Sequence, residues 1–250
     1  MTPPTLAGLD AVIFDMDGVV TETATVHAAA WKQLFDGYLA ERSRRNGEPF
    51  VPFDVAADYP AYVDGKNRYD GVASFLDSRR IALPWGDPSD PPGAGTVCGL
   101  GNRKDRLFLD RLAAEGATAF PSTVALLHEL RGDGVRSALV TASRNADQVL
   151  EAAGVAGLFD ARVDGVVAAD LHLPGKPDPA TFVEAARRLG VDRRRAAVVE
   201  DALAGVAAAA AGHFALVVGV ARTGDPEALR RAGADVVVSD LAELGAVPST

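Results

Sequence analysis

Short apolar runs that end in acidic residues are the main pattern of this chain. Four apolar residues at 11–14 lead directly into Asp15, and Asp17 and Gly18 follow. A short, uninterrupted apolar run bounded by turn residues is typical of a strand that is buried on both faces. We therefore expect both carboxylates at the carboxyl end of that strand, where open α/β sheets bind ligands.

Helical and apolar stretches alternate from residue 121 onward. The alternation of strand and helix favours an α/β fold, with a Rossmann-like parallel-sheet core and helices on both faces. The predicted strands are 135–141, 161–167, 196–200, 214–220 and 235–238, and the predicted helices are 121–132, 144–153, 179–189, 202–211 and 225–232.

Residues 21–117 contain helices and loops but no convincing strand. Helical spacing predicts helices over about 23–39, 68–80 and 102–115. Prolines interrupt the stretch 40–68, and the Pro- and Gly-rich stretch 84–101 should be an exposed loop. Because the strand at 11–14 belongs with the later strands, the prediction is a core of 1–20 and 118–250. Residues 21–117 are then an inserted helical cap that determines substrate specificity.

The composition narrows the possible functions. A net charge of −9 over 250 residues argues against a nucleic-acid surface, which needs basic stripes, but it leaves a phosphorylated small molecule open. Cys98 is the only cysteine, so no intrachain disulfide is possible. The first ten residues lack the basic and apolar regions of a signal peptide, which makes the cytoplasm the expected location.

One uncharged stretch, residues 202–221, is long enough to resemble a membrane span. It is mostly alanine in its first half and rich in valine in its second, and Gly212 and His213 divide it. That division predicts a helix followed by a buried strand, so we expect no membrane association.

Three further strand ends or loops carry reactive groups. Thr141-Ala142-Ser143 follows one predicted strand, Glu200-Asp201 ends another, and Lys176 lies in the turn Gly-Lys-Pro-Asp-Pro before a helix. Each has an ordinary structural interpretation when it is taken singly: a strand-end cap, an acidic helix start and a rigid turn. Their combination with Asp15 and Asp17 favours a catalytic interpretation.

In this order, the motifs resemble those of the haloacid dehalogenase superfamily. They are D-M-D-G-V at 15–19, T-A-S at 141–143, Lys176 and E-D at 200–201. The resemblance implies that Asp15 forms an aspartyl-phosphate and that Asp17 is the general acid and base. It also implies that Thr141, Ala142 and Lys176 bind the transferring phosphoryl group. The metal ligands would be Asp15, Asp17 through its backbone carbonyl, Glu200 and Asp201.

The residues themselves agree with a magnesium site. Four carboxylates at one edge of a sheet repel each other unless a cation is present, and an all-oxygen ligand set suits Mg²⁺ better than Zn²⁺. An Asp at position 17 also favours phosphoryl transfer over dehalogenation, because only phosphoryl transfer needs an acid for a leaving oxygen.

The likeness extends to the β-phosphoglucomutase branch of the superfamily. The run from Asp17 to Lys32, D-G-K-N-R at 64–68, N-R-K at 102–104 and S-R-N-A at 143–146 are similar to that branch. Departures from it are Thr141, Arg144 and Glu22, where serine, lysine and aspartate are more usual. The resemblance implies that Thr23 lies at the cap hinge and that His27 supports Asp17. It implies that Trp31 and Lys104 contact the substrate from the cap and that Arg68 binds the non-transferring phosphate. Asn145 would lie beside the phosphoryl site.

The resemblance implies a phosphoglucomutase that interconverts β-glucose 1-phosphate and glucose 6-phosphate, with glucose 1,6-bisphosphate as activator and intermediate. Two alternatives stay open: a sugar-phosphate phosphatase with the same core, and a non-catalytic sugar-phosphate sensor. His27 could be an ordinary helix residue and Arg68 an ordinary surface cation. We further expect a monomer, with a pathway link to a disaccharide phosphorylase.

Overall fold

The computed structural model describes residues 6–222 and 224–244. By its internal contacts the chain divides into two compact units, Met1–Glu22 with Ala117–Thr250, and Thr23–Gly116. We call them the core unit and the helical unit. The expected boundaries, 1–20 with 118–250 and 21–117, differ from these by one or two residues at each junction.

The core unit is built on a six-stranded parallel sheet in the order β3-β2-β1-β4-β5-β6. The two strands that pair with β1, β2 and β4, lie far from it in sequence. Strand β1 is in the interior of the sheet, and all of its residues are buried. The strands are β1 (Ala11–Asp15), β2 (Arg136–Val140), β3 (Ala161–Val163), β4 (Ala196–Glu200), β5 (Leu216–Val220) and β6 (Val236–Val238).

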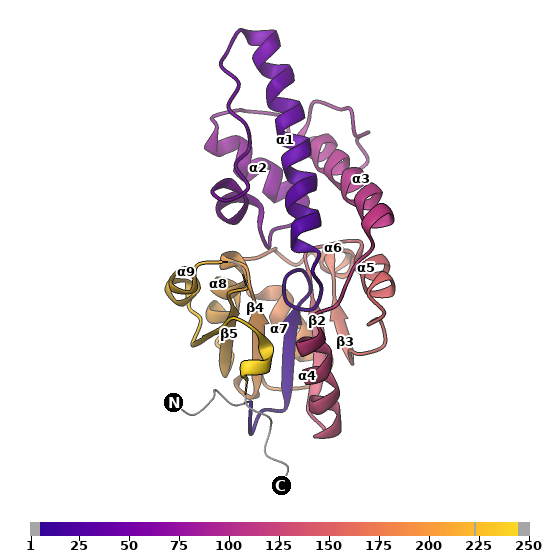
Figure 1. The fold of residues 1–250 in the computed structure, drawn as a ribbon, viewed down its shortest axis with the longest axis vertical. Coiled ribbons are helices and arrows are strands. Elements are labelled where there is room, and N and C mark those ends of the chain that lie inside the picture. The colour runs from indigo at the N-terminus through magenta and orange to yellow at the C-terminus, as the bar shows by residue number, and fades with distance from the viewer. Residues whose placement is uncertain (1–5, 223, 245–250) are drawn as a thin grey trace. The chain divides into compact units, whose positions relative to one another are not determined.

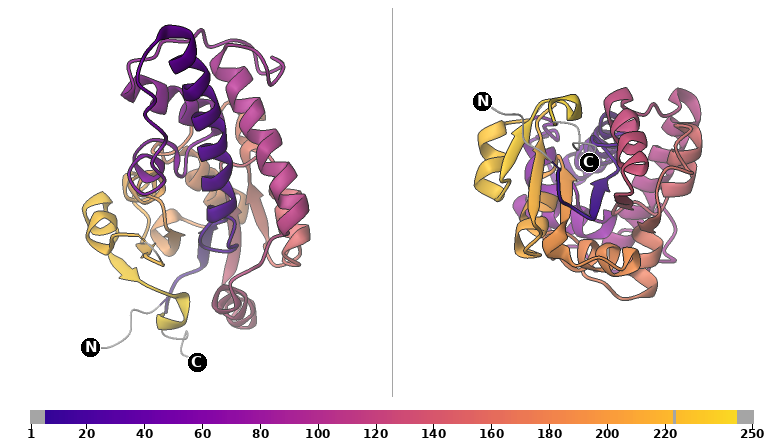
Figure 2. Two further views of the ribbon diagram at one scale, coloured as in Figure 1. Left: turned by 45° about the horizontal axis from the view of Figure 1, so that its top comes forward. Right: turned by 90° about the horizontal axis from the view of Figure 1, so that it is seen from below.

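Helices cover both faces of this sheet (Figure 1; Figure 2). Alternate residues of β1 point to opposite faces, so Ala11 and Ile13 pack with one set of helices while Val12 and Phe14 face the other. One face carries α7 (Ala180–Leu189), α8 (Leu203–Ala211) and α9 (Pro226–Ala232), and the other carries α4 (Pro121–Gly132) and α5 (Ala146–Ala152).

Two sequence predictions for the core need comment. The expected strand 161–167 is wrong in its second half, because Gly165–Asp170 forms α6. The Asp164 side chain accepts hydrogen bonds from the N–H groups of Val166 and Val167, and this cap starts the helix. The stretch 202–221 is α8 followed by β5. Within the residues described, the structure contains no helix with the length and apolarity that a membrane span requires.

The helical unit contains α1 (Ala24–Asn46), α2 (Arg68–Ser78) and α3 (Val97–Glu115), with a short π-helical turn at Tyr59–Val63. Helix α1 continues well beyond the predicted end near residue 39 and stops at Gly47, whose φ is +69°. Helix α3 begins five residues before the predicted start, because the Thr96 hydroxyl accepts a hydrogen bond from the Gly99 N–H. Residues 97–101, the last five of the expected exposed loop 84–101, are therefore buried helix.

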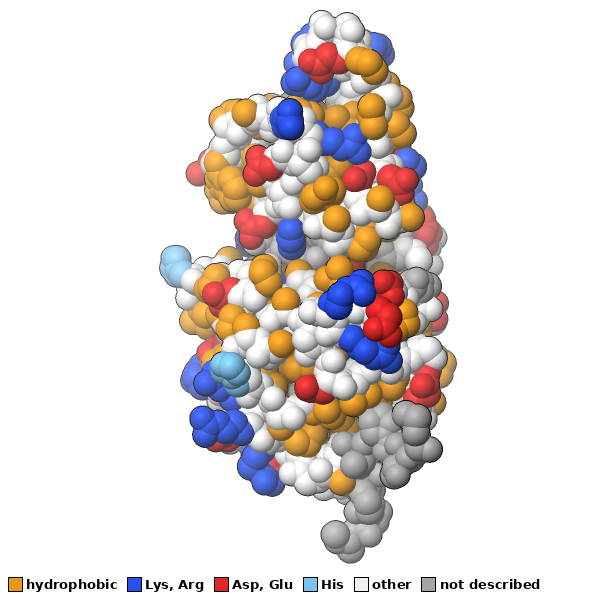
Figure 3. All heavy atoms as spheres, turned by 90° about the vertical axis from the view of Figure 1, so that its left-hand side faces the viewer, with side chains coloured by type: hydrophobic (Ala, Val, Ile, Leu, Met, Phe, Trp, Pro, Cys, Tyr) orange, Lys and Arg blue, Asp and Glu red, His pale blue; other side chains and the backbone are white. Residues whose placement is uncertain are grey.

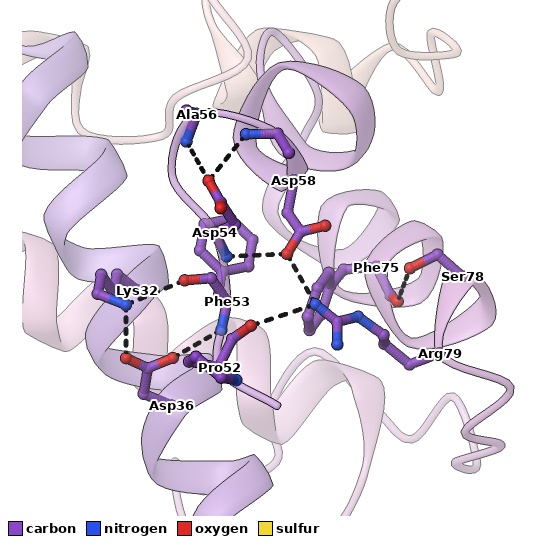
Figure 4. Close-up of polar contacts among 11 residues, drawn as sticks. Lys32, Asp36, Pro52, Phe53, Asp54, Ala56, Asp58, Phe75, Ser78 and Arg79 are labelled. Carbon is purple, nitrogen blue, oxygen red and sulfur yellow. Dashed lines mark hydrogen bonds and ion pairs between the residues drawn. The ribbon is translucent and has the colours of Figure 1, made fainter. Parts of the chain in front are cut away.

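An aromatic cluster forms the interior of the helical unit. Phe35 of α1 lies 4.0 Å from Phe75 of α2 and 5.3 Å from Phe53, measured between ring centroids. Phe53 comes from the connection between α1 and the π-helical turn, and Figure 4 shows how its backbone is held there. Its N–H donates to Asp36 and its carbonyl accepts from Lys32. The connection is thus fixed by one buried ring and by hydrogen bonds to α1.

The face drawn in Figure 3 mixes basic and acidic side chains with uncharged ones. Blue and red side chains lie side by side near the middle of this view, and several blue side chains gather at its lower left.

Candidate active site

The register of the sheet brings three of the predicted site segments together. Asp15 is the last residue of β1 and pairs with Val140, the residue before Thr141. Phe14 pairs with Val199, the residue before Glu200. Because β2 and β4 lie on the two sides of β1, the ends of all three strands meet at one edge, with Asp15 in the middle.

A buried lysine joins two of the carboxylates at this edge. Lys176 reaches the site from the connection between α6 and α7, and its Nζ donates to Asp15 Oδ1 at 2.5 Å and to Glu200 Oε2 at 2.7 Å. The three side chains are almost fully buried. Desolvation of each buried charge is costly, so the three groups must lie within hydrogen-bond distance for their attraction to offset that cost.

Glu200 is held by the chain as well as by Lys176. Its Oε1 accepts a hydrogen bond from the N–H of Ala202 at 3.0 Å, and the residue is 0% exposed. Gly205 of α8 provides the space, since a Cβ at that position would lie 2.1 Å from the Glu200 carboxyl carbon. A glycine within an alanine-rich helix is the sequence signal for this close contact.

Asp201 completes an acidic group. One carboxylate oxygen from each of Asp15, Glu200 and Asp201 lies within 4.8 Å of the other two, as expected for residues that could hold a metal ion. Gly18 makes room for Asp201: its φ is +87°, and a Cβ there would lie 1.8 Å from Asp201 Oδ2. The turn glycine after D-M-D thus serves both the backbone conformation and the position of the acid.

Asp17 lies two residues beyond Asp15, in the turn that follows β1, and is half-buried. Its backbone forms an isolated parallel bridge with Thr21. Its carboxylate is outside the group of three acids, which is compatible with a separate task for this side chain.

The electrostatics of the site favour an added cation. Burial raises the pKa of Asp15 well above its usual range, the charge of Glu200 raises it further, and the Lys176 ammonium opposes both. Burial by itself disfavours the ammonium of Lys176, but Asp15 and Glu200 outweigh it and raise the pKa of this lysine. One ammonium cannot balance Asp15, Asp17, Glu200 and Asp201, and a divalent cation with oxygen ligands fits this donor set.

The loop after β2 is held in a compact turn. The N–H of Thr141 donates to the Val163 carbonyl, and its hydroxyl accepts from the N–H of Ser143. The Ser143 hydroxyl in turn accepts from the N–H of Asn145. Thr141 and Asn145 are buried and Ala142 is half-buried. The turn therefore presents a set of polar groups at the same strand edge as Asp15.

Within the helical unit, three of the five predicted residues form one group, in which Trp31 and Lys104 are buried and His27 is half-buried. His27 and Trp31 are four residues apart on α1, and Lys104 comes from α3. Lys104 Nζ lies 2.5 Å from His27 Nδ1 and 5.1 Å from the centroid of the Trp31 ring. Phe108, one turn after Lys104, stacks on His27 with ring centroids 4.0 Å apart. Phe108 was not among the predicted site residues, although it lies four residues after Lys104, at helical spacing.

The other two predicted residues of the helical unit lie at helix starts. Thr23 is buried directly before α1, and its carbonyl accepts from the N–H of His27. Arg68 is the first residue of α2 and forms an ion pair with Asp105, a residue that sequence analysis did not single out.

Comparison with known proteins identifies the family. The model of the haloacid dehalogenase-like hydrolases matches residues 9–213, which include every motif of the core site. The chain belongs to the haloacid dehalogenase-like hydrolase family. The matched range includes both the strand that ends at Asp15 and the inserted helical unit.

Relatives of this family member include named enzymes of two kinds. The chain is 53% identical over 237 residues to a β-phosphoglucomutase of Mycobacterium bovis. The match covers 94% of this chain and 90% of the relative. It is 30% identical over 243 residues to a validoxylamine A 7'-phosphate phosphatase of Streptomyces hygroscopicus. That match covers 93% of this chain and 94% of the relative.

A solved structure supports the fold. The crystal structure of a β-phosphoglucomutase from Clostridium difficile matches with a TM-score of 0.75 and 24% identity, and covers 95% of this chain and 93% of that one. At this identity the likeness concerns the arrangement of the α/β core and inserted helices, and it agrees with the parallel sheet described above.

Proposed function

We propose that this protein is a Mg²⁺-dependent β-phosphoglucomutase, which interconverts β-glucose 1-phosphate and glucose 6-phosphate. The observation that carries the proposal is the 53% identity to a protein of that name along nearly the whole of both chains. The core geometry supports it, because Asp15, Lys176 and Glu200 form the buried ion triad that phosphoryl transfer to a carboxylate would need.

In this proposal the reaction has two halves. An aspartyl-phosphate at Asp15 transfers its phosphoryl group to the free hydroxyl of the sugar phosphate, which gives glucose 1,6-bisphosphate and the free carboxylate. The bisphosphate then turns round, a carboxylate oxygen of Asp15 attacks its other phosphorus, and the bond from that phosphorus to the sugar oxygen breaks. Asp17 takes the hydroxyl proton in the first half and returns a proton to the leaving oxygen in the second.

The remaining core residues bind and orient the reacting groups. Lys176, Thr141, Ala142 and Asn145 bind the oxygens of the transferring phosphoryl group. Asp15, the backbone carbonyl of Asp17, Glu200 and Asp201 would hold Mg²⁺, which when bound neutralises charge on that group. The acidic group of Asp15, Glu200 and Asp201 supports this ligand assignment.

The helical unit would recognise the part of the substrate that does not react. Arg68 binds the second phosphate, and Lys104 contacts the sugar from its place beside His27 and Trp31. Thr23, at the start of α1, is the hinge position in this proposal. Arg68 and Lys176 favour a substrate with a phosphate at each end, since each phosphate then has its own cationic group.

The test follows glucose 6-phosphate and free phosphate in one reaction with Mg²⁺, β-glucose 1-phosphate and a trace of glucose 1,6-bisphosphate. We expect glucose 6-phosphate to form without release of phosphate, and α-glucose 1-phosphate to give no product. Asp15→Asn should be inactive, while Asp10→Asn, which removes a carboxylate at the exposed start of β1, should behave as the wild type. If the wild-type protein forms no glucose 6-phosphate, the proposal is refuted.

A phosphatase is the second candidate, because the validoxylamine phosphate phosphatase is similar along 93% of this chain. The same core would then transfer the phosphoryl group from Asp15 to water. Free phosphate without glucose 6-phosphate in the reaction above would establish that alternative.

The substrate also defines the reaction that supplies it. β-Glucose 1-phosphate carries the phosphate on the anomeric carbon, and phosphorolysis of a glucosidic bond yields such a compound directly. The pathway partner in this proposal is therefore a disaccharide phosphorylase. Accumulation of β-glucose 1-phosphate in cells that lack this protein, during growth on the disaccharide, is the expected result.

A further inference from the structure

Asp105 holds Arg68 at the surface of the helical unit. Arg68 Nη1 lies 2.5 Å from Asp105 Oδ1, and the two side chains are 17% and 27% exposed. The Arg68 guanidinium also lies 5.4 Å from the centroid of the neighbouring Tyr69 ring. Asp105 and Tyr69 therefore both hold the Arg68 guanidinium in place.

Packing of α2 against α3 creates this pair. Gly101 precedes Asp105 by about one helical turn, on the same side of α3. A Cβ at position 101 would lie 2.6 Å from the Tyr69 ring and 3.5 Å from Arg68 Cγ. Glycine there lets the first turn of α2 approach α3 closely, and this approach brings Asp105 to the guanidinium.

The ion pair leaves part of the guanidinium unused. Arg68 Nε is buried and has no hydrogen-bond partner among the described residues. A guanidinium can donate two parallel hydrogen bonds to a phosphate, but a phosphate bound beside Asp105 would meet a carboxylate of like charge. The carboxylate and the phosphate therefore compete for one cation.

We propose that Asp105 is a positioning residue that acts through Arg68, as the counter-ion that occupies the guanidinium whenever the second phosphate is absent. This rests on the proposed function, in which Arg68 binds the non-transferring phosphate. A resident carboxylate weakens phosphate binding, and it also lets the bisphosphate leave Arg68 in order to turn round. Both phosphates of the intermediate must occupy this position once in each catalytic cycle.

The test compares Asp105→Asn with Asp110→Asn, which removes the same charge from an exposed position on the same helix. In the β-glucose 1-phosphate assay, Asp105→Asn should lower KM by about two- to fivefold, the range of a partly exposed ion pair, and should also lower kcat. Asp110→Asn should change neither. Asp105→Glu keeps the charge and should restore both values toward those of the wild type.

A double-variant cycle separates this role from a structural one. In an Arg68→Ala background, Asp105→Asn should leave KM unchanged, because the cation through which it acts is gone. A higher KM in Asp105→Asn, or an equal change in both backgrounds, would overturn the proposal. Thermal unfolding of each variant shows whether it is folded. Failure of the proposed function is a separate outcome, since wild-type protein would then form no glucose 6-phosphate.

Discussion

The core unit and the helical unit place their charged groups by different means. In the core unit, Asp15 and Glu200 lie at the ends of neighbouring parallel strands, so backbone hydrogen bonds of the sheet set their separation. In the helical unit, Lys104 lies on a helix face and is surrounded by the rings of Trp31 and Phe108, 5.1 and 5.0 Å from its Nζ. Side-chain packing, and not a strand ladder, sets that position.

This difference predicts different responses to substitution. In the core site, loss of the Lys176 ammonium leaves buried carboxylates without compensation, whereas loss of one carboxylate relieves their mutual repulsion. A change to the helical unit alters packing of rings or one partly exposed ion pair. The core should therefore be sensitive to charge, and the helical unit to side-chain volume.

The largest effect should come from Asp15→Asn. The amide retains the shape of the side chain but is a poor nucleophile, so kcat should fall by roughly 10³-fold or more. Loss of one of several crowded carboxylates should leave the unfolding temperature equal to or above that of the wild type. A variant with substantial remaining turnover would contradict the assignment of Asp15 as the nucleophile.

Lys176→Met should be the most destabilising change in the core. Methionine fills a similar volume, but Asp15 and Glu200 then lie buried without the cation that joins them, which should cost about 3–5 kcal/mol of unfolding free energy. Urea unfolding with and without Mg²⁺ measures this loss. Added Mg²⁺ should recover part of it in the variant, and equal stability of variant and wild type would contradict the ion triad.

Phe53→Ala tests the helical unit. Phe53 is 1% exposed and packs on Phe35 and Phe75, so its truncation should cost about 3–5 kcal/mol of unfolding free energy. Both of the chain's 2 tryptophans, Trp31 and Trp85, lie in this unit, so tryptophan fluorescence follows its unfolding alone.

The matched control for that experiment is Phe50→Ala. Phe50 precedes Phe53 on the same connection but is 48% exposed, and its truncation should leave the fluorescence transition almost unchanged. Equal effects of the two substitutions would show that the aromatic cluster does not stabilise the unit.

The smallest effect should come from Glu184→Gln on α7. Hydrogen bonds from Arg187 and Arg188 lower the pKa of Glu184 from 4.5 to about 2. The folded state favours the carboxylate, so its contribution is fully present above pH 4.5 and is lost as pH falls from there toward 2. Because the arginines are partly exposed, we expect at most about 1 kcal/mol at pH 7.

The measurement for Glu184→Gln is the difference in unfolding free energy from the wild type at pH 7 and at pH 4. The difference should be smaller at pH 4. A difference that grows on acidification would contradict the lowered pKa.

Much of the core could be predicted from the sequence because its signals are local. Runs such as Ala11–Phe14 are apolar throughout, and only a strand covered on both faces buries every residue of such a run. The acids and the lysine follow these runs or lie in a turn, so their place at the sheet edge follows from parallel topology. The segment 161–167 was misread because the Asp164 cap was not recognised within an apolar stretch.

The helical unit was harder to predict, since its helix limits depend on partners far along the chain. Gly99 and Gly101 resemble the end of a loop, yet they lie in α3 where Ala94 and Tyr69 approach too closely for a Cβ. The pair of Arg68 with Asp105 links α2 to α3 and has no local sequence signal.

The sequence by itself therefore determined the α/β core, the insertion of a helical segment and the residues of the candidate core site, because hydrophobic periodicity and motif order are properties of the chain alone. Only the tertiary structure decided that Lys176 joins Asp15 to Glu200, that glycines 18 and 205 make room for the acids, and that Asp105 holds Arg68. Such contacts depend on distances between side chains from separate elements, and those distances are fixed only when the elements pack.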